Sequence, residues 1–187
     1  MKRRALLQGL AAAPLFALFR HGLAAPAGTA PQSVEELQRT WKTLLAEGAD
    51  VALTTEPLQR SDEEWRKLLT RMQYYVMRKE GTEAPFSSAL NTEKRPGVFA
   101  CAGCNLALFT SAMKFDSGTG WPSYFTTIQG VLATQRDFTL AYPRTEYHCI
   151  RCGSHHGHVF DDGPRPTGLR YCNNGVALKF IPKTGAA

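Results

Sequence analysis

The chain has 187 residues, of which 43% are hydrophobic and 20% are charged, and its formal net charge is +6 at pH 7. This length is enough for one ordinary domain with its own hydrophobic core. Four of the 22 basic residues lie within residues 1–30, which contain no acidic residue, so the rest of the chain has 18 basic and 16 acidic residues. Because this remainder is nearly neutral, we expect no nucleic-acid binding.

Residues 1–30 are predicted to be an export signal. The charged start "MKRR" precedes "ALLQGLAAAPLFALF", an apolar run that is shorter than the roughly 20 residues of a membrane-spanning helix. Small residues then offer cleavage sites near Ala24 or Ala25. The pair Arg3–Arg4 resembles a twin-arginine signal, with a general secretory signal or an uncleaved anchor as alternatives. We expect a periplasmic protein with no stable membrane association after export, or a cytoplasmic one if the signal is not used.

Residues 31–59 are predicted to form a linker and an N-terminal helical extension. The stretch "SVEELQRTWKTLLAEG" predicts a helix that begins at the capping-box pair Ser33 and Glu36. A second such pair, Ser61 and Glu64, begins "SDEEWRKLLTRMQYYVMRKEG", which we interpret as one helix. Its predicted apolar side is made of Trp65, Leu68, Leu69 and Met72. We expect both helices to lie at the periphery of a larger unit.

Residues 60–183 are predicted to form the main domain, followed by a tail at 184–187. From Gly81 onward, short apolar runs such as "GVFACAGC", "LALFTS" and "TEYHCIRCG" alternate with Gly, Pro, Asn and Asp. This pattern is typical of short antiparallel strands joined by tight turns. The sequence therefore predicts a mainly β fold.

Four of the five cysteines occur in two CxxC pairs, "CAGC" and "CIRC". The spacing lets both sulfurs of a pair face one point, so the two pairs can surround a zinc ion tetrahedrally. Such a four-thiolate site is coordinatively closed and would stabilise the fold without performing chemistry. Two disulfides are the alternative in an exported protein, although a disulfide within a CxxC closes a small, strained ring. The predicted ligands of one structural Zn²⁺ are Cys101, Cys104, Cys149 and Cys152.

The fifth cysteine, Cys172, lies in "GLRYCNNG". If "LRYCNNGVALKF" is one strand, alternation places Arg170, Cys172 and Asn174 on the same face. A nearby arginine favours the thiolate over the thiol, which makes a nucleophile. The alternative is a buried thiol that acts as a small apolar side chain.

Two further stretches carry candidate site residues. "SHHGHVFDD" supplies three histidines and two aspartates, and histidines three apart beside a carboxylate can hold and protonate an oxygen atom. Each of these histidines could instead be an ordinary core or surface residue. "FDSGTGWPS" places Trp121 in a glycine-rich loop, where the indole could form the wall of a small apolar pocket or fill the core.

These motifs together resemble the B-type methionine-R-sulfoxide reductases. The resemblance covers about residues 60–182 and is carried by "GTEAPFS", "CAGC", "FDSGTGWPS", "CIRCGSHHGHVFDDGPRPTGLRYCNN" and "ALKF". It implies two twisted antiparallel sheets, a β-tent-like fold, with a structural zinc bound by the four paired cysteines. It also implies reduction of the R epimer of methionine sulfoxide, mainly in proteins.

The resemblance also implies roles for individual residues. Cys172 would be the nucleophile that becomes a sulfenic acid, and Trp121 would pack against the substrate methyl group. His158 and His155 would supply or relay protons to the sulfoxide oxygen. The implied supporting polar residues are Asp162, Arg170 and Asn174.

The chain departs from the common pattern of this family at two positions. Many members have a resolving cysteine where this chain has Thr119, so we expect no intramolecular disulfide and direct reduction by a thioredoxin-like protein or a small thiol. Asn173 replaces a usually apolar residue, and we expect an effect on local packing or partner docking. The competing hypothesis is a non-catalytic, zinc-ribbon-like binding module, which would need none of Cys172, His158 and Trp121 together.

Overall fold

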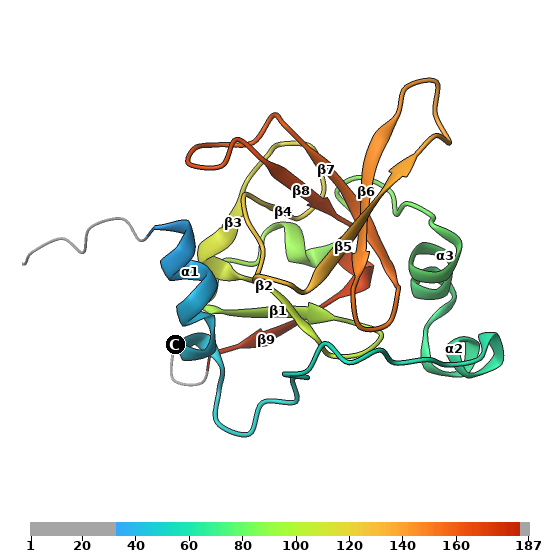
Figure 1. Cartoon of the computed structure of the whole chain (residues 1–187), viewed down its shortest axis with the longest axis horizontal. Helices are drawn as coiled ribbons and strands as arrows, with labels where there is room; N and C mark the ends of the chain where they lie inside the picture. The colour runs from blue at the N-terminus through green and yellow to red at the C-terminus, as the bar shows by residue number, and fades with distance from the viewer. Residues whose placement is uncertain (1–32, 184–187) are drawn as a thin grey trace, which may run out of the picture. The chain divides into compact units, whose positions relative to one another are not determined.

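The computed structural model describes residues 33–183 (Figure 1), which belong to one compact unit, Gln32–Ala187. The export signal predicted at residues 1–30 and the tail predicted at residues 184–187 lie outside the described residues. Within the described range, none of the helices combines the length and the apolar character needed to cross a membrane.

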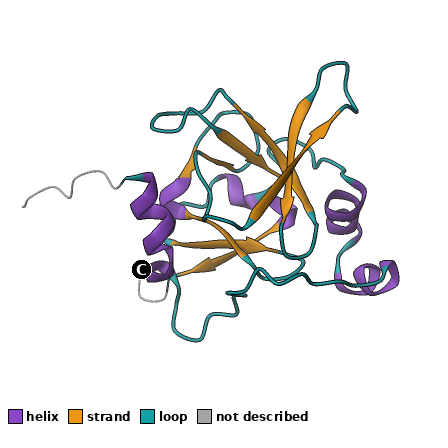
Figure 2. Cartoon of the chain, viewed as in Figure 1, coloured by secondary structure: helices purple, strands orange, loops and turns teal. Residues whose placement is uncertain are grey.

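Two antiparallel sheets form the centre of the domain (Figures 1 and 2). In spatial order the smaller sheet contains β2 (Ala107–Thr110), β1 (Gly97–Cys101) and β9 (Leu178–Pro182). The larger sheet contains, also in spatial order, β3 (Lys114–Phe115), β4 (Ser123–Tyr124), β8 (Arg170–Asn173), β7 (His155–Phe160), β6 (Arg144–Cys149) and β5 (Leu132–Asp137). The predicted mainly β fold with two antiparallel sheets is therefore confirmed.

Aromatic side chains from both sheets form the core. Phe109 of β2 stacks on Tyr124 of β4, with ring centroids 4.1 Å apart, and Phe99 of β1 meets the same tyrosine edge to face. Tyr147 of β6 extends the group, and all four residues are almost completely buried. Because large aromatic rings bury much apolar area, these contacts hold the two sheets together.

The N-terminal extension packs on this domain through a helix shorter than the sequence predicts. Helix α1 (Val34–Thr40) begins at Ser33, whose hydroxyl accepts a hydrogen bond from the Glu36 N–H, and the 3₁₀ helix η1 (Trp41–Leu44) follows. Leu37 is buried, and the Gln38 side chain donates hydrogen bonds to the Thr126 hydroxyl and the Thr127 carbonyl oxygen. The helical extension therefore lies against the loop that follows β4.

The single helix predicted for residues 61–81 is wrong, because two helices occupy this stretch. Helix α2 (Asp62–Leu68) begins at the predicted capping box of Ser61 and Glu64, and α3 (Arg71–Lys79) begins at a second capping box, Thr70 with Gln73. The chain changes direction at Leu69, which ends α2 in an extended conformation. Trp65 and Leu69 are buried as expected, but Leu68 and Met72 are about half exposed.

The stretch "LRYCNNGVALKF" is likewise not one strand. β8 ends at Asn173, the 3₁₀ helix η4 (Gly175–Ala177) follows, and β9 then enters the other sheet. Two further 3₁₀ turns, η2 (Ala89–Asn91) and η3 (Ser111–Met113), lie in connecting segments. Cys172 therefore lies near the end of a strand from which the chain crosses between the two sheets.

Candidate active site

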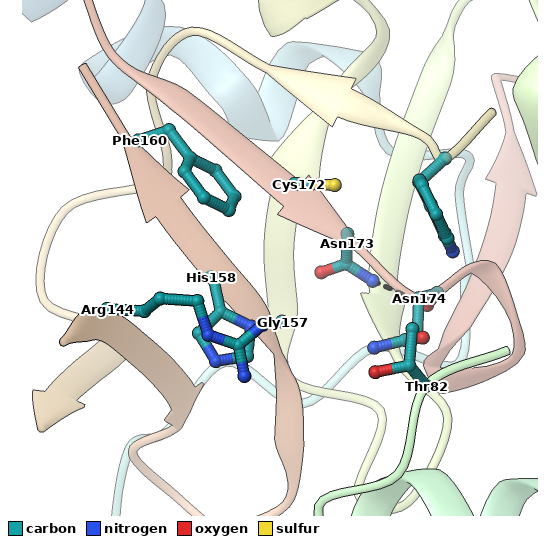
Figure 3. Close-up of a pocket in the computed structure, with 9 residues that line it drawn as sticks. Thr82, Arg144, Gly157, His158, Phe160, Cys172, Asn173 and Asn174 are labelled. Carbon is teal, nitrogen blue, oxygen red and sulfur yellow. Dashed lines mark hydrogen bonds between the residues drawn. The ribbon is translucent and has the colours of Figure 1, made fainter. Parts of the chain in front are cut away.

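Cys172 lies in the middle of the larger sheet. On one side it pairs with His158 of β7, and on the other with Ser123 of β4. A cavity of about 130 Å³ opens beside it (Figure 3), and the side chain is partly exposed to this space. The residues that line the cavity are Thr82, Trp121, Arg144, Gly157, His158, Phe160, Cys172, Asn173 and Asn174.

A glycine allows β7 and β8 to approach closely. At Gly157 of β7, an added Cβ atom would lie 1.9 Å from the carbonyl oxygen of Cys172. Any side chain at this position would therefore push β7 and β8 apart at Cys172. This requirement explains a glycine between His156 and His158 in the sequence.

Burial has the largest effect on the pKa of Cys172. Loss of contact with water raises the pKa of the thiol above its ordinary value. The positive charge of Arg170 and hydrogen bonding by Thr119 act in the opposite direction but do not reverse the shift. The sequence correctly identified the arginine as a thiolate-favouring neighbour, but the strand interior adds a desolvation effect that local sequence does not reveal.

Arg170 acts on Cys172 from outside the cavity lining. Its guanidinium group donates two hydrogen bonds to the Asp162 carboxylate, each 2.8 Å long, and lies 4.4 Å from the centre of the Phe160 ring. These hydrogen bonds lower the pKa of Asp162. The arginine side chain is thereby fixed beneath the thiol by an ion pair and by an aromatic face.

His158 is the histidine that faces the reactive cysteine. Its Nε2 atom lies 2.8 Å from Oδ2 of Asp137, and the Arg144 guanidinium contacts the same carboxylate oxygen at 2.5 Å. Burial lowers the pKa of His158, while Asp137 raises it and the charge of Arg144 lowers it. Hydrogen bonds from Thr139, and then from His158 and Arg144, lower the pKa of Asp137.

His155 lies next to His158 but does not line the Cys172 cavity. The two ring centroids are 5.6 Å apart, and His155 Nδ1 lies 2.6 Å from a carboxylate oxygen of Glu146. His155 instead lines a second cavity of about 260 Å³ on the side of α3. His156 is fully buried against Tyr147, and burial lowers its pKa to about 4.

Asn174 and Trp121 are both held by Glu83, a residue that follows α3. The Glu83 N–H donates to the Asn174 side-chain oxygen at 2.9 Å, and the Glu83 carbonyl oxygen accepts from the Trp121 indole N–H at 3.2 Å. The buried Glu83 carboxylate accepts hydrogen bonds from the backbone N–H groups of Gly175 and Val176. One residue thus positions both the cavity wall and the end of the catalytic strand.

Asn173 is completely buried, which rules out a direct role in partner docking. Its side-chain oxygen accepts a hydrogen bond from the Tyr147 hydroxyl at 2.8 Å, and its amide nitrogen donates to the Asn174 carbonyl oxygen. Asn173 therefore makes polar contacts inside the core.

Thr119 lies in the glycine-rich loop before β4, at the position where the resemblance leads us to look for a resolving cysteine. Its hydroxyl lies 2.8 Å from that of Ser117, which lies 2.8 Å from the hydroxyl of Ser123 on β4. Ser123 is the residue directly opposite Cys172 across the sheet. Hydroxyl groups thus surround the cysteine on this side.

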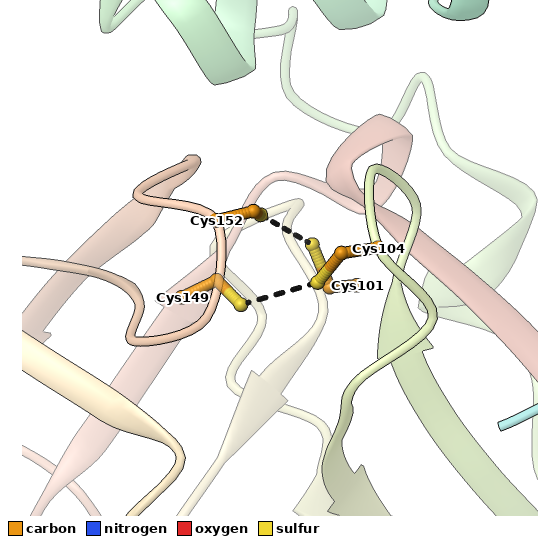
Figure 4. Close-up of side chains that lie close together, drawn as sticks. All are labelled: Cys101, Cys104, Cys149 and Cys152. Atoms are coloured by element: carbon orange, nitrogen blue, oxygen red, sulfur yellow. Dashed lines mark hydrogen bonds between the residues drawn. The ribbon is translucent and has the colours of Figure 1, made fainter. Parts of the chain in front are cut away.

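The four paired cysteines lie close together (Figure 4). Their sulfur atoms lie within 4.8 Å of one another, all four residues are buried, and none forms a disulfide. The two closest pairs join the two motifs, with Sγ–Sγ distances of 3.7 Å for Cys101–Cys152 and 3.5 Å for Cys104–Cys149. Four ligands at about 2.3 Å from a tetrahedral zinc ion would be about 3.8 Å apart, so the cluster has metal-binding geometry.

The sequence analysis missed several residues around the cysteine. Phe160 and Arg144 line the cavity because β7 pairs with β8 and β6 pairs with β7, and Asp137 reaches His158 from the end of β5. Thr82, Glu83 and Phe160 had a local signal, since Thr82 and Glu83 lie in the "GTEAPFS" motif and Phe160 lies in "SHHGHVFDD". Arg144 and Asp137 are brought to the site by the pairing of strands that are distant in sequence.

Comparison with known proteins agrees with this geometry. Residues 69–182 match the SelR domain family. Over 129 residues the chain is 49% identical to a Methanosarcina barkeri protein named peptide methionine sulfoxide reductase MsrB, and the match covers 68% of this chain and 91% of that protein. Proteins of the same name from Leptospira interrogans and Agrobacterium fabrum are 48% and 47% identical, over 66% and 70% of this chain and 95% and 97% of their own lengths. The chain therefore belongs to the B family of peptide methionine-R-sulfoxide reductases.

Proposed function

We propose that this chain reduces the R epimer of methionine sulfoxide in proteins to methionine, with Cys172 as the nucleophile. The observation that carries the proposal is the composition of one cavity. Cys172, the single cysteine outside the four-cysteine cluster, shares it with His158 and with Trp121. A nucleophile, a proton donor and an apolar wall are the groups that sulfoxide reduction requires.

The reaction starts with attack of the Cys172 thiolate on the sulfoxide sulfur. The sulfoxide oxygen carries partial negative charge and must be protonated as its bond to sulfur breaks, and His158 is placed to supply that proton. The sulfoxide sulfur accepts two electrons and becomes the thioether of methionine. The Cys172 sulfur loses two electrons and becomes a sulfenic acid, so one oxygen atom moves from substrate to enzyme in the overall balance.

Regeneration of Cys172 is proposed to need an external thiol. A first thiol attacks the sulfenic sulfur and releases water, and a second thiol breaks the resulting mixed disulfide. The other four cysteines lie together in the buried cluster, and Thr119 occupies the position of a resolving thiol. The proposed donor is a thioredoxin-like protein or a small thiol, acting in the periplasm if the N-terminal segment directs export.

Epimer choice is proposed to follow from the asymmetry of the cavity. Trp121 and Phe160 present apolar surface, whereas His158 and Arg144 present polar groups. A sulfoxide sulfur carries one methyl group and one oxygen, so only one epimer places the methyl on the apolar wall while its oxygen faces the proton donor.

The four-cysteine cluster is proposed to hold one structural Zn²⁺. All four of its ligand positions are occupied by Cys101, Cys104, Cys149 and Cys152, so zinc would contribute to folding and leave no coordination site for substrate. Removal of zinc should lower the melting temperature, and Cys172→Ser should leave both zinc content and melting temperature unchanged.

The decisive experiment incubates the full chain with dithiothreitol and a peptide that contains both epimers of methionine sulfoxide. Chromatography should show loss of the R epimer alone, and Cys172→Ser should abolish this loss. Survival of both epimers with a folded, zinc-loaded wild-type chain would contradict catalysis and favour the zinc-ribbon-like binding module.

A further inference from the structure

The turn that joins β5 to β6 exposes an unusual set of apolar side chains. Residues 138–143, "FTLAYP", form this turn at the tip of the hairpin (Figure 1) and contain no charged residue. Phe138, Leu140 and Tyr142 are 73%, 45% and 61% exposed. Hairpin tips usually carry Gly, Asn, Asp or Ser, so three exposed apolar side chains here suggest a contact surface. We refer to residues 138–143 as the apolar turn.

The apolar turn is anchored directly to the candidate active site. Asp137 and Arg144 form the last residue pair of the hairpin, and the turn spans the residues between them. The Asp137 carboxylate contacts His158 at 2.8 Å, and Arg144 lines the Cys172 cavity. The exposed side chain of Phe138 is therefore one residue away from a group that contacts the proposed proton donor.

The size of the cavity indicates which part of a protein substrate lies outside it, near the turn. A space of about 130 Å³ beside Cys172 accommodates one amino-acid side chain, so the rest of a protein substrate must remain outside. An extended polypeptide advances about 3.3 Å per residue. The residues that flank the methionine sulfoxide in sequence must consequently run across the rim, and the apolar turn ends directly before Arg144, one of the residues that line the cavity.

The chemistry of the flanking residues favours an apolar partner. Methionine is among the residues most often buried in proteins, so the side chains packed around it are mostly apolar. Oxidation to the sulfoxide makes the methionine side chain polar and disrupts the core around it, which exposes those apolar side chains.

We propose that the apolar turn is a docking surface for the apolar residues that flank methionine sulfoxide in a loosened or unfolded polypeptide. This inference rests on the proposed function, since it assigns the part of the substrate outside the cavity. The turn would increase the affinity for polypeptide substrates without taking part in the reaction at sulfur.

The test uses two fluorescent peptides with a single methionine sulfoxide, one flanked by Leu, Val and Phe and the other by Gly and Ser. Fluorescence anisotropy on zinc-loaded protein in the Cys172→Ser background, which cannot convert the sulfoxide, gives the Kd of each peptide without turnover. In this background the chain with the wild-type turn should bind the apolar-flanked peptide about tenfold more tightly, the effect expected of one or two well-packed apolar contacts. The combined variant Phe138→Ser, Leu140→Ser and Tyr142→Ser should lose this preference.

A matched control replaces three other exposed apolar residues, Leu53, Leu68 and Met72, by serine, and it should keep the wild-type preference. Reduction of N-acetyl methionine sulfoxide with dithiothreitol should proceed at the same rate in all three proteins when each carries Cys172.

Equal binding of both peptides by the chain with the wild-type turn, or an equal loss of the binding preference in the control variant, would overturn the proposal. A change confined to the KM for a thioredoxin-like reductant would also overturn it, because the turn would then be a reductant-docking surface. Failure of the wild type to reduce even the small substrate would contradict the proposed function, while the anisotropy result would still decide the docking proposal.

Discussion

Arg170 and Asp162 form a two-point ion pair, with Nε to Oδ1 and Nη2 to Oδ2 distances of 2.8 Å each. The Asp162 side chain is more than half exposed, whereas the Arg170 side chain is largely buried. The pair therefore holds one positive charge close to Cys172 and places its counter-charge toward solvent.

Removal of the Arg170 charge should make Cys172 less reactive. Arg170 lowers the pKa of Cys172, so Arg170→Met should raise that pKa further. Below the pKa, each unit of increase reduces the thiolate population about tenfold. The rate of iodoacetamide alkylation at pH 8, measured on zinc-loaded protein, should fall accordingly.

The variant Asp162→Asn should change the alkylation rate in the opposite direction. The Asp162 charge raises the pKa of Cys172, so its removal should accelerate alkylation, provided that the aromatic contact with Phe160 keeps Arg170 in place. Equal alkylation rates in the wild type and both variants would show that Arg170 does not tune the thiol.

The pH dependence of turnover should report on His158 and Cys172 together. Burial lowers the pKa of His158 and raises that of Cys172. The reactive form, with His158 protonated and Cys172 ionised, is then a minor fraction of the singly protonated site. Its amount falls about tenfold for each unit that separates the two pKa values further. Activity should follow a bell-shaped curve whose acid limb reflects His158 and whose alkaline limb reflects Cys172.

Two substitutions should move the acid limb of that curve in opposite directions. Asp137 raises the pKa of His158, so Asp137→Asn should shift the acid limb to lower pH and reduce the maximal rate. The charge of Arg144 lowers the same pKa, so Arg144→Gln should shift the limb to higher pH. Measurement of kcat between pH 5 and pH 10 tests both, and a shift of the same sign in the two variants would argue against His158 as the titrating group.

Glu83 should be important for both stability and positioning. Glu83→Gln replaces one carboxylate oxygen by an amide N–H₂ group, which cannot accept the hydrogen bond from Gly175 or Val176. The loss of one buried, charge-assisted hydrogen bond should lower the free energy of unfolding by about 2 kcal/mol, measured by urea denaturation. Glu56→Gln, at an exposed carboxylate, should change it little. A wild-type unfolding curve for Glu83→Gln would contradict this role.

The sequence predicted those parts of the site whose chemistry is carried by short motifs. Cys172, the four clustered cysteines and the CxxC spacing are visible in the chain itself, and so is the capping box at Ser61. The second capping box, Thr70 with Gln73, was also present in the sequence, but the apolar spacing across Leu69 suggested a continuous helix. Tertiary contacts overrode that spacing.

Residues that depend on strand pairing could not be predicted in this way. Arg144 and Asp137 reach the site only because β5 and β6 pair in one register, and the burial that raises the pKa of Cys172 comes from the whole sheet. The end of β8 at Asn173 depends on Glu83, which is 90 residues earlier in the sequence and accepts a hydrogen bond from Gly175. Local patterns do not specify which distant segments will meet.

A thiol introduced at position 119 should convert the mode of regeneration. Thr119 acts on Cys172 through a hydrogen bond, so Thr119→Cys should place a second sulfur within reach of the Cys172 sulfenic acid. After one turnover without reductant, the variant should form an intramolecular disulfide with release of water. The wild type should instead retain a sulfenic acid that reacts with dimedone. Intact mass measurement after alkylation distinguishes these products. Thr55→Cys, at an exposed position before α2, is the matched control and should behave as the wild type does. A Cys172-containing intramolecular disulfide in the wild type would refute regeneration by an external thiol alone, because one of the clustered cysteines would then be the resolving thiol.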